Sequence, residues 1–203
     1  MAKGLLLPAF YLPNISYFQA IKQATGPIEL EKFEHFPKQT FRNRTQIATS
    51  SGVLSLTVPI VHGRKDHLAM KDIQISYDHP WQRLHWLSLQ TAYRSAAYFE
   101  FYEDEFRPFY HGSYKWLFDF HYQQLQLLLK LLRMDREIVF TEAYTAPSGQ
   151  GVDYRVDLHP KKPSLLENSR PYFQLFQEKQ GFLSDLSIVD LLFNQGPDAK
   201  NYF

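Results

Sequence analysis

The opening 33 residues constrain the fold of this chain more than any other stretch. The apolar run at 5–7 ends at a proline and is typical of a short buried strand. Helical periodicity follows at 15–24, and Asn14 stands where an N-cap residue is expected. Residues 28–33 alternate in polarity and predict a second strand. The order strand, loop, helix, strand is the start of an α/β fold, in which ligands often bind where the first strand meets its helix.

Residues 38–60 predict a β-hairpin whose turn is Ser50-Ser51-Gly52. The second arm alternates as a half-buried strand does, with Leu54, Leu56, Val58 and Ile60 on one side and Ser55 and Thr57 on the other. Pro59 indicates that this arm lies at or near a sheet edge. The predicted fold class is therefore α/β: a single layered domain with a mixed sheet that includes the β-hairpin, flanked by helices.

The strongest helical patterns lie in the middle of the chain. A period of about 3.6 residues predicts helices at 81–99 and at 113–134. Between them, residues 100–110 mix acidic and aromatic side chains around Pro108, which predicts only a turn or two of helix.

The remaining third of the chain predicts one more strand and further helices. Residues 137–144 are a central-strand candidate, and 153–163 predict an exposed connection. Capping and stop signals after residue 164 favour two short helices. We therefore expect one domain over 1–203, with 164–203 as a C-terminal helical extension packed on it.

Composition excludes several classes of protein. The 22 basic residues against 21 acidic ones give a formal charge of +1, which argues against a dedicated nucleic-acid binder. Without cysteine, disulfides, thiolate catalysis and cysteine zinc sites are excluded. The first 13 residues hold no apolar run long enough for a signal segment or a transmembrane helix, so we expect a cytoplasmic protein without membrane insertion. The 16% aromatic content leaves a homodimer open.

The basic cluster Arg42-Asn43-Arg44 precedes the hairpin and is a candidate anion clamp. In an extended segment the two guanidiniums point the same way, so one phosphate, carboxylate or nucleotide-sugar pyrophosphate could meet both. The alternative is a solvated strand entry with surface ion pairs.

Three further side chains are candidates for a site. His85 lies on the predicted 81–99 helix and is a candidate general acid or base; the alternative is a core histidine bonded to a backbone carbonyl. Tyr11 and Asn14 could contact a ligand at the first strand-to-helix turn, although Asn14 also fits a helix cap. His121 fits a structural role better than a catalytic one.

Other site templates are missing from the sequence. His62 and His67 flank an aspartate but lack a recognised ligand spacing, so no metal site is predicted. There is no GxSxG, no P-loop and no GxGxxG, and no cofactor is assigned.

Short motifs along most of the chain resemble the WbqC-like family, most closely its Bacteroidetes-type branch. They are Tyr11-Leu12-Pro13, Tyr17-Phe18, Asn43-Arg44, Leu56-Thr57-Val58-Pro59, Trp81-Gln82-Arg83-Leu84-His85-Trp86, Gly181-Phe182-Leu183-Ser184 and Asp190-Leu191-Leu192-Phe193-Asn194. Much of that family has a His-Gln-Pro stretch before the first tyrosine, and this chain has Leu7-Pro8-Ala9 instead.

The resemblance implies a bacterial protein with a role in building surface sugars of the O-antigen type. We therefore expect a transferase-like enzyme that binds an anionic or sugar-linked small molecule. The alternative is a non-catalytic binding or assembly protein with an aromatic surface patch. That patch would comprise Tyr98, Phe99, Phe101, Tyr102, Phe109 and Tyr110.

Overall fold

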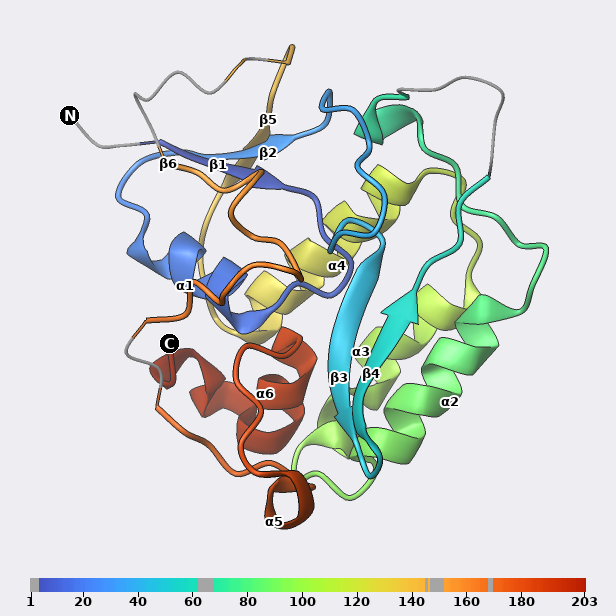
Figure 1. The fold of residues 1–203 in the computed structure, drawn as a ribbon, viewed down its shortest axis with the longest axis vertical. Helices are drawn as coiled ribbons and strands as arrows, with labels where there is room; N and C mark the ends of the chain where they lie inside the picture. Colours follow the sequence, from blue (N-terminus) through green and yellow to red (C-terminus); the bar gives the residue numbers. More distant parts are fainter. Residues whose placement is uncertain (1–3, 62–67, 145, 147–151, 168–169) are drawn as a thin grey trace.

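The computed structural model describes residues 4–61, 68–144, 146, 152–167 and 170–203. A parallel sheet, an antiparallel hairpin and flanking helices make up the fold (Figure 1), which confirms the predicted α/β class. His62 and His67 lie outside the described residues.

The main sheet has four strands in the order β5-β2-β1-β6, and every neighbouring pair is parallel. Its strands are β1 (Leu5–Pro8), β2 (Ile28–Glu31), β5 (Ile138–Phe140) and β6 (Val152–Asp153). β1 and β2 are central, and their apolar side chains are mostly buried, as expected of parallel strands covered on both sides. Because the strands run in parallel, their carboxyl ends meet at one edge of the sheet.

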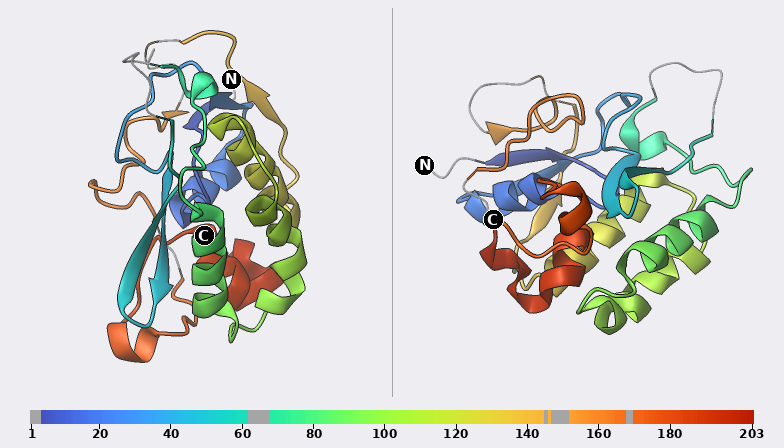
Figure 2. Two further views of the ribbon diagram at one scale, coloured as in Figure 1. Left: turned by 90° about the vertical axis from the view of Figure 1, so that its right-hand side faces the viewer. Right: turned by 60° about the horizontal axis from the view of Figure 1, so that its bottom comes forward.

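The hairpin forms a two-stranded sheet of its own, from β3 (Arg44–Thr49) and β4 (Gly52–Thr57), rather than part of the main sheet. It extends away from the main sheet and lies to one side of the helices (Figure 2). Leu56 and Val58 of its second arm are buried, whereas Leu54 near the tip is 37% exposed. The apolar side of the arm is therefore covered only near its root.

The helices pack against the two sheets. They are α1 (Ile15–Gln23), α2 (Trp81–Tyr93), α3 (Phe99–His111), α4 (Leu117–Leu131), α5 (Gln177–Gln180) and α6 (Ile188–Gln195), with short 3-10 helices at Met70–Asp72 and Gly196–Asn201. None of the helices formed by the described residues has the length and apolar character needed to cross a membrane.

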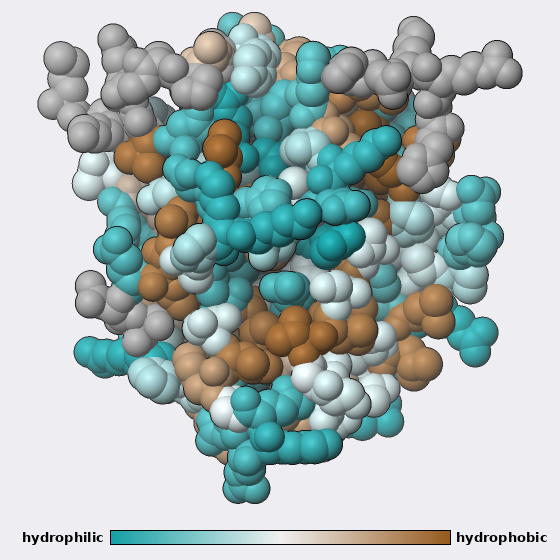
Figure 3. Space-filling view, viewed as in Figure 1, coloured by the Kyte–Doolittle hydropathy of each residue, from teal (hydrophilic) through white to brown (hydrophobic). Residues whose placement is uncertain are grey.

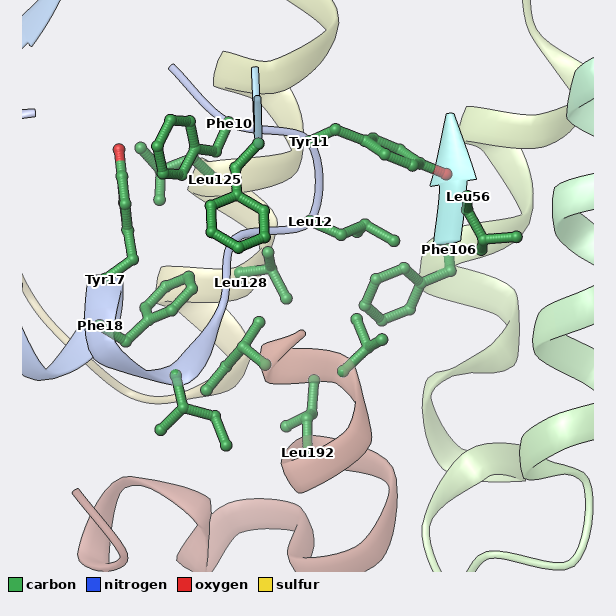
Figure 4. Close-up of a cluster of buried hydrophobic side chains, with 14 of the residues drawn as sticks. Phe10, Tyr11, Leu12, Tyr17, Phe18, Leu56, Phe106, Leu125, Leu128 and Leu192 are labelled. Carbon is green, nitrogen blue, oxygen red and sulfur yellow. The ribbon is translucent and has the colours of Figure 1, made fainter. Parts of the chain in front are cut away.

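One hydrophobic core joins these elements (Figure 4). The loop after β1 contributes Phe10 and Leu12, and α1 contributes Phe18. In the view of Figure 4, Phe106 of α3 reaches the same cluster from the right, and Leu192 of α6 reaches it from below. The short segment that follows β1 is thus packed from several directions and held in one place.

Two helix predictions were wrong at their boundaries. The helix predicted at 81–99 ends at Tyr93, because the Tyr98 amide donates to the Phe193 carbonyl of α6 instead of continuing the helix. Residues 100–110 belong to a full helix, α3, that runs through Pro108. Its buried stripe, which includes Phe99, Phe106 and Phe109, stabilises it despite the hydrogen bond that the proline removes.

The strand predictions beyond α4 also needed correction. The segment 137–144 contains only the three-residue β5, which pairs at the sheet edge rather than in the centre. The supposed exposed connection at 153–163 begins in β6, beside β1, and its Arg155 and Leu158 are buried. Its contacts come from residues far away in sequence, so local polarity could not reveal them.

The C-terminal region lies against the rest of the described chain. α6 is almost entirely buried and contacts α1, α3 and β3. Tyr172 and Gln174 lie ahead of α5 and direct their side chains to the buried Asp190 of α6, so a helix does not form there. The division at residue 164 stays a prediction.

Two glycines with positive φ allow a test of packing at the C-terminal region. Gly196 (φ 57°) ends α6, and a Cβ there would lie 2.4 Å from the Tyr98 ring, whereas a Cβ on Gly181 (φ 74°) would meet nothing within 4 Å. We expect Gly196→Ala to lower the free energy of unfolding by about 2–4 kcal/mol, from backbone strain plus overpacking. Gly181→Ala should cost only about 1–2 kcal/mol, the strain alone. Urea unfolding measures both, and equal losses would contradict the packing argument.

Candidate functional site

A buried ion pair fixes Arg42 at the carboxyl end of the main sheet. Arg42 lies in the turn before β3, is 2% exposed, and donates from Nε and Nη2 to the two carboxylate oxygens of Glu34 at 2.7 and 2.5 Å. Glu34 follows β2, and Nη2 of Arg42 also reaches the Arg155 carbonyl at 2.9 Å. The hairpin root is therefore joined to the segments that leave β2 and β6.

A second guanidinium lies beside the first. Arg155 donates from Nε and Nη2 to Asp153, and from Nη1 to the fully buried Glu31 at 2.9 Å. Glu31 also accepts from the Thr141 hydroxyl after β5. Residues that follow β2, β5 and β6 are thus linked through one chain of charged hydrogen bonds.

A pocket of about 400 Å³ opens at these groups. Its charged walls are Arg42, Arg155 and Glu34, and the Tyr144 ring lies 5.0 Å from the Arg155 guanidinium. Burial raises the pKa of Glu34, although Arg42 opposes that effect. Arg42 is paired with Glu34, and Arg155 with Asp153 and Glu31, but Nη1 of Arg42 makes no hydrogen bond within the described part of the chain and is a donor available to a ligand. Such a pocket suits an anionic group accompanied by an apolar or ring-shaped part.

The Glu31–Arg155 pair gives a stability prediction. Arg155→Met leaves the Glu31 carboxylate buried without its cation, and we expect a loss of about 3–5 kcal/mol in the free energy of unfolding. Adding Glu31→Gln should restore part of that loss, because the unpaired charge disappears. The control, Lys130→Met, breaks the exposed pair with Glu105 and should cost less than about 1 kcal/mol. Urea unfolding of the wild type and these three variants measures the losses. Equal losses for Arg155→Met and Lys130→Met would contradict the prediction.

His85 belongs to a different cluster. The Tyr11 hydroxyl bonds Nδ1 of His85 at 2.9 Å and the Tyr110 hydroxyl at 3.0 Å. All three side chains are buried, and they come from the loop after β1, from α2 and from α3. None of them lines the Arg42 pocket. Tyr11 and His85, which were predicted separately as site residues, are therefore in contact with each other, and neither lines the pocket at Arg42.

More buried polar groups surround this cluster. The Tyr11 ring lies 6.1 Å from the His121 ring, and the Trp81 ring lies 5.1 Å from that of His85. Both amide atoms of Gln124 and Nε1 of Trp81 have no hydrogen-bond partner in the described structure, and the His121 ring lies near the Ala9 backbone without a well-formed hydrogen bond. Burial lowers the pKa of His85 to about 4 and that of His121 to about 3. Both imidazoles are therefore neutral near pH 7.

The two histidines predict a steep acid sensitivity. Each folded-state pKa lies below the ordinary histidine value of 6.5, so protonation favours the unfolded chain. Their contribution to stability is present above pH 6.5 and is lost as the pH falls towards 4. For His85 the loss is about 3 kcal/mol over that window. Urea unfolding between pH 4 and 7 should give a shallower slope for His85→Gln than for the wild type, with His111→Gln, an exposed imidazole of α3, as comparison. Identical slopes for the wild type and His85→Gln would contradict the prediction.

Asn14 stands at the N-cap position of α1 but does not make the capping bond. Asp185 makes it instead, accepting from the Ser16 amide at 2.7 Å. The same carboxylate accepts from the Ser16 and Ser164 hydroxyls and from Nδ2 of Asn14. Burial raises the pKa of Asp185 against these bonds. The helix is thus capped by a residue from the C-terminal region.

The other two residues of the basic cluster lie at the hairpin root. Asn43 donates to the Val58 carbonyl at 3.0 Å, and its own carbonyl accepts from the Val58 amide, so it extends the pairing of the two arms. Arg44 begins β3 and is half-buried. Arg42 lies in a turn rather than an extended segment, so the expected alignment of the two guanidiniums does not apply. The ligand-binding role predicted for the cluster stays a prediction.

Several residues around the pocket were missed from the sequence. Glu34 directly follows the strand predicted at 28–33, a position at which ligand contacts are expected in α/β folds, and Glu31 lies within that strand. That signal was available. The role of Arg155 depends on β6, which is two residues long and has no recognisable pattern. Across the described ranges, no group of three or more His, Asp or Glu side chains could hold a metal ion.

Comparison with known proteins places this fold and site in a family. The profile of the WbqC-like protein family matches residues 9–162, so the chain belongs to that family. The match includes Arg42 and His85 and ends within the segment that follows β6.

One curated relative matches over the whole chain. It is the Uncharacterized protein Rv1507c of Mycobacterium tuberculosis (strain ATCC 25618 / H37Rv), 26% identical over 233 residues, covering 100% of this chain and 97% of that protein. No solved structure matches this chain.

Proposed function

We propose that the protein is a transferase-like enzyme of bacterial surface-polysaccharide biosynthesis, and that its anionic or nucleotide-sugar-like ligand binds in the Arg42 pocket. Membership of the WbqC-like family supports the polysaccharide role. The pocket supports the ligand class. The two lines of support are independent, because one comes from the sequence and the other from side-chain geometry.

The observation that carries the proposal is the position and lining of the pocket. Open α/β sheets bind ligands outside the carboxyl ends of their strands, and the pocket lies where β2 and β6 end. Its guanidiniums are already held in place by Glu34, Asp153 and Glu31, so binding costs little side-chain ordering. Among the described residues Nη1 of Arg42 has no hydrogen-bond acceptor, so it is a donor for a phosphate or carboxylate oxygen.

A group that transfers a proton to or from the ligand has to lie beside it. Glu34 lies on the pocket wall, and burial moves its pKa upwards. His85, the residue predicted from sequence, would act through Tyr11 and the loop after β1. We propose Glu34 as the group next to the ligand and retain His85 as a prediction.

The aromatic surface patch of the alternative function is not formed as predicted. Phe99, Phe109 and Tyr110 are buried in the core. Of the six aromatic side chains only Phe101 is largely exposed, at 76%. One exposed ring does not make an interaction surface, so the binding or assembly function has less support.

A charge series at Val156 tests the ligand class without disturbing the ion pairs. Val156 lines the pocket and is 61% exposed, so the fold should tolerate polar replacements. For uridine diphosphate or a uridine-diphosphate sugar, we expect Val156→Glu to weaken binding by about three- to tenfold and Val156→Lys to strengthen it similarly. Val156→Gln is the uncharged control.

Isothermal titration calorimetry at low salt gives the dissociation constants. Equal affinities across the three variants, or the opposite order, would rule out an anion in this pocket. Absence of binding across a panel of nucleotides and nucleotide sugars would end the proposal itself.

A further inference from the structure

A second hollow lies beside the Arg42 pocket. It has a volume of about 120 Å³ and is bounded by the loop after β1, the start of the hairpin, segment 157–165 and residues 184–185. Phe41 lines the hollow, and its neighbour Arg42 lines the pocket. In the same way, Asp157 lines the hollow and its neighbour Val156 lines the pocket. The two spaces therefore share a wall. Figure 1 shows segment 157–165 crossing in front of α1, and much of this face is hydrophilic (Figure 3).

The charged side chains around the hollow already have hydrogen-bond or ion-pair partners. The Asp185 carboxylate accepts four hydrogen bonds, and Asp157 is paired with Lys162 at 3.0 Å. Nδ1 of His159 accepts the Lys161 amide, and burial together with nearby cations lowers the pKa of that imidazole. The Asp185 carboxylate is bonded by neutral donors and the Lys162 cation is paired, so none of the described residues that line the hollow is an unpaired cation that would select an anion.

Neutral hydrogen-bonding groups do remain. Nδ2 of Asn14 donates to Asp185 and to Ser16, which fixes the carboxamide orientation, and its Oδ1 has no partner among the residues described. Asn14 is only 5% exposed. Buried polar atoms normally have a hydrogen-bond partner, so an unpaired Oδ1 at this position is unusual. Within the same part of the chain, the Gln46 side chain makes no hydrogen bond, and the neutral His159 ring keeps Nε2 as a donor.

The apolar part of the lining is compatible with a ring. Phe41 and Leu158 are almost fully buried beneath the polar groups, and Pro160 and Pro163 lie in the loop above. At about 30 Å³ for each water in the liquid, the hollow corresponds to about four waters, enough for part of a sugar ring to be seated in it. Apolar faces with amide and imidazole groups around them suit the C–H faces and hydroxyls of such a ring.

We propose that the hollow is a subsite for an uncharged, polyhydroxylated ring: the sugar unit of a ligand whose anionic part occupies the Arg42 pocket. This inference rests on the proposed function for the anionic part. It adds that recognition of the ligand is divided between a charged pocket and a neutral hollow. Gln46 and His159 are specificity-determining residues for the sugar.

The test compares nucleotide sugars with their matched nucleoside diphosphates. The probes are uridine and guanosine diphosphate and their glucose, N-acetylglucosamine and mannose derivatives, measured by isothermal titration calorimetry. For the sugar that fits, we expect the derivative to bind at least about tenfold more tightly than the diphosphate. Gln46→Leu and His159→Leu should each reduce that advantage by about three- to tenfold and leave diphosphate affinity unchanged. Gln123→Leu, on the exposed side of α4, is the matched control.

The outcomes separate the subsite from the function. Equal affinities for the diphosphates and their sugar derivatives would overturn the subsite. So would tighter binding of a sugar derivative that persists in both Gln46→Leu and His159→Leu. Neither result would contradict the anion pocket. If no nucleotide compound binds, the proposed function fails. Binding of free monosaccharides then tests the hollow separately. Millimolar monosaccharide that shifts the Gln46 side-chain amide signals in NMR spectra supports the hollow as a sugar site, and unshifted signals overturn it.

Discussion

The Arg42–Glu34 pair is the interaction on which the arrangement of the molecule most depends. It joins the turn before the hairpin to the segment that leaves β2, and the Arg42–Arg155 bond adds the segment that leaves β6. The two sheets share no strand, so these bonds hold the hairpin root against the carboxyl end of the main sheet. Burying charged groups is costly, and apolar replacements are often as stable. A ligand that binds a fixed guanidinium would explain why these buried charged groups are present.

Local patterns predicted much of the fold. The strand at Leu5–Pro8, the helix at Ile15–Gln23 and the hairpin all follow from periodicity and turn residues within a few positions. The errors arose where distant residues decide the structure. Val152–Asp153 becomes a strand because it pairs with the backbone of β1. Tyr98 leaves the helix because the Phe193 carbonyl of α6 accepts its amide hydrogen.

The candidate site was less predictable for the same reason. Tyr11 and His85 were chosen separately and lie in contact, whereas the contacts of Arg42 are with Glu34 and Arg155 rather than with His85. Residue type identified Arg42 as an unusual side chain, but it could not identify the partners that neutralise it. Partners 113 residues away along the chain, as with Arg155, leave no trace in local sequence.

The cap of α1 has a consequence for how the chain folds during synthesis. Asp185 emerges from the ribosome 169 residues after Ser16, whose amide it accepts. Until then the first helix lacks its cap, and β1 also waits for the residues of β6 on one side. Contacts this far apart in sequence slow folding, and they keep the early segments incomplete while translation proceeds. We therefore expect the nascent N-terminal half to depend on chaperones more than its compact final form suggests.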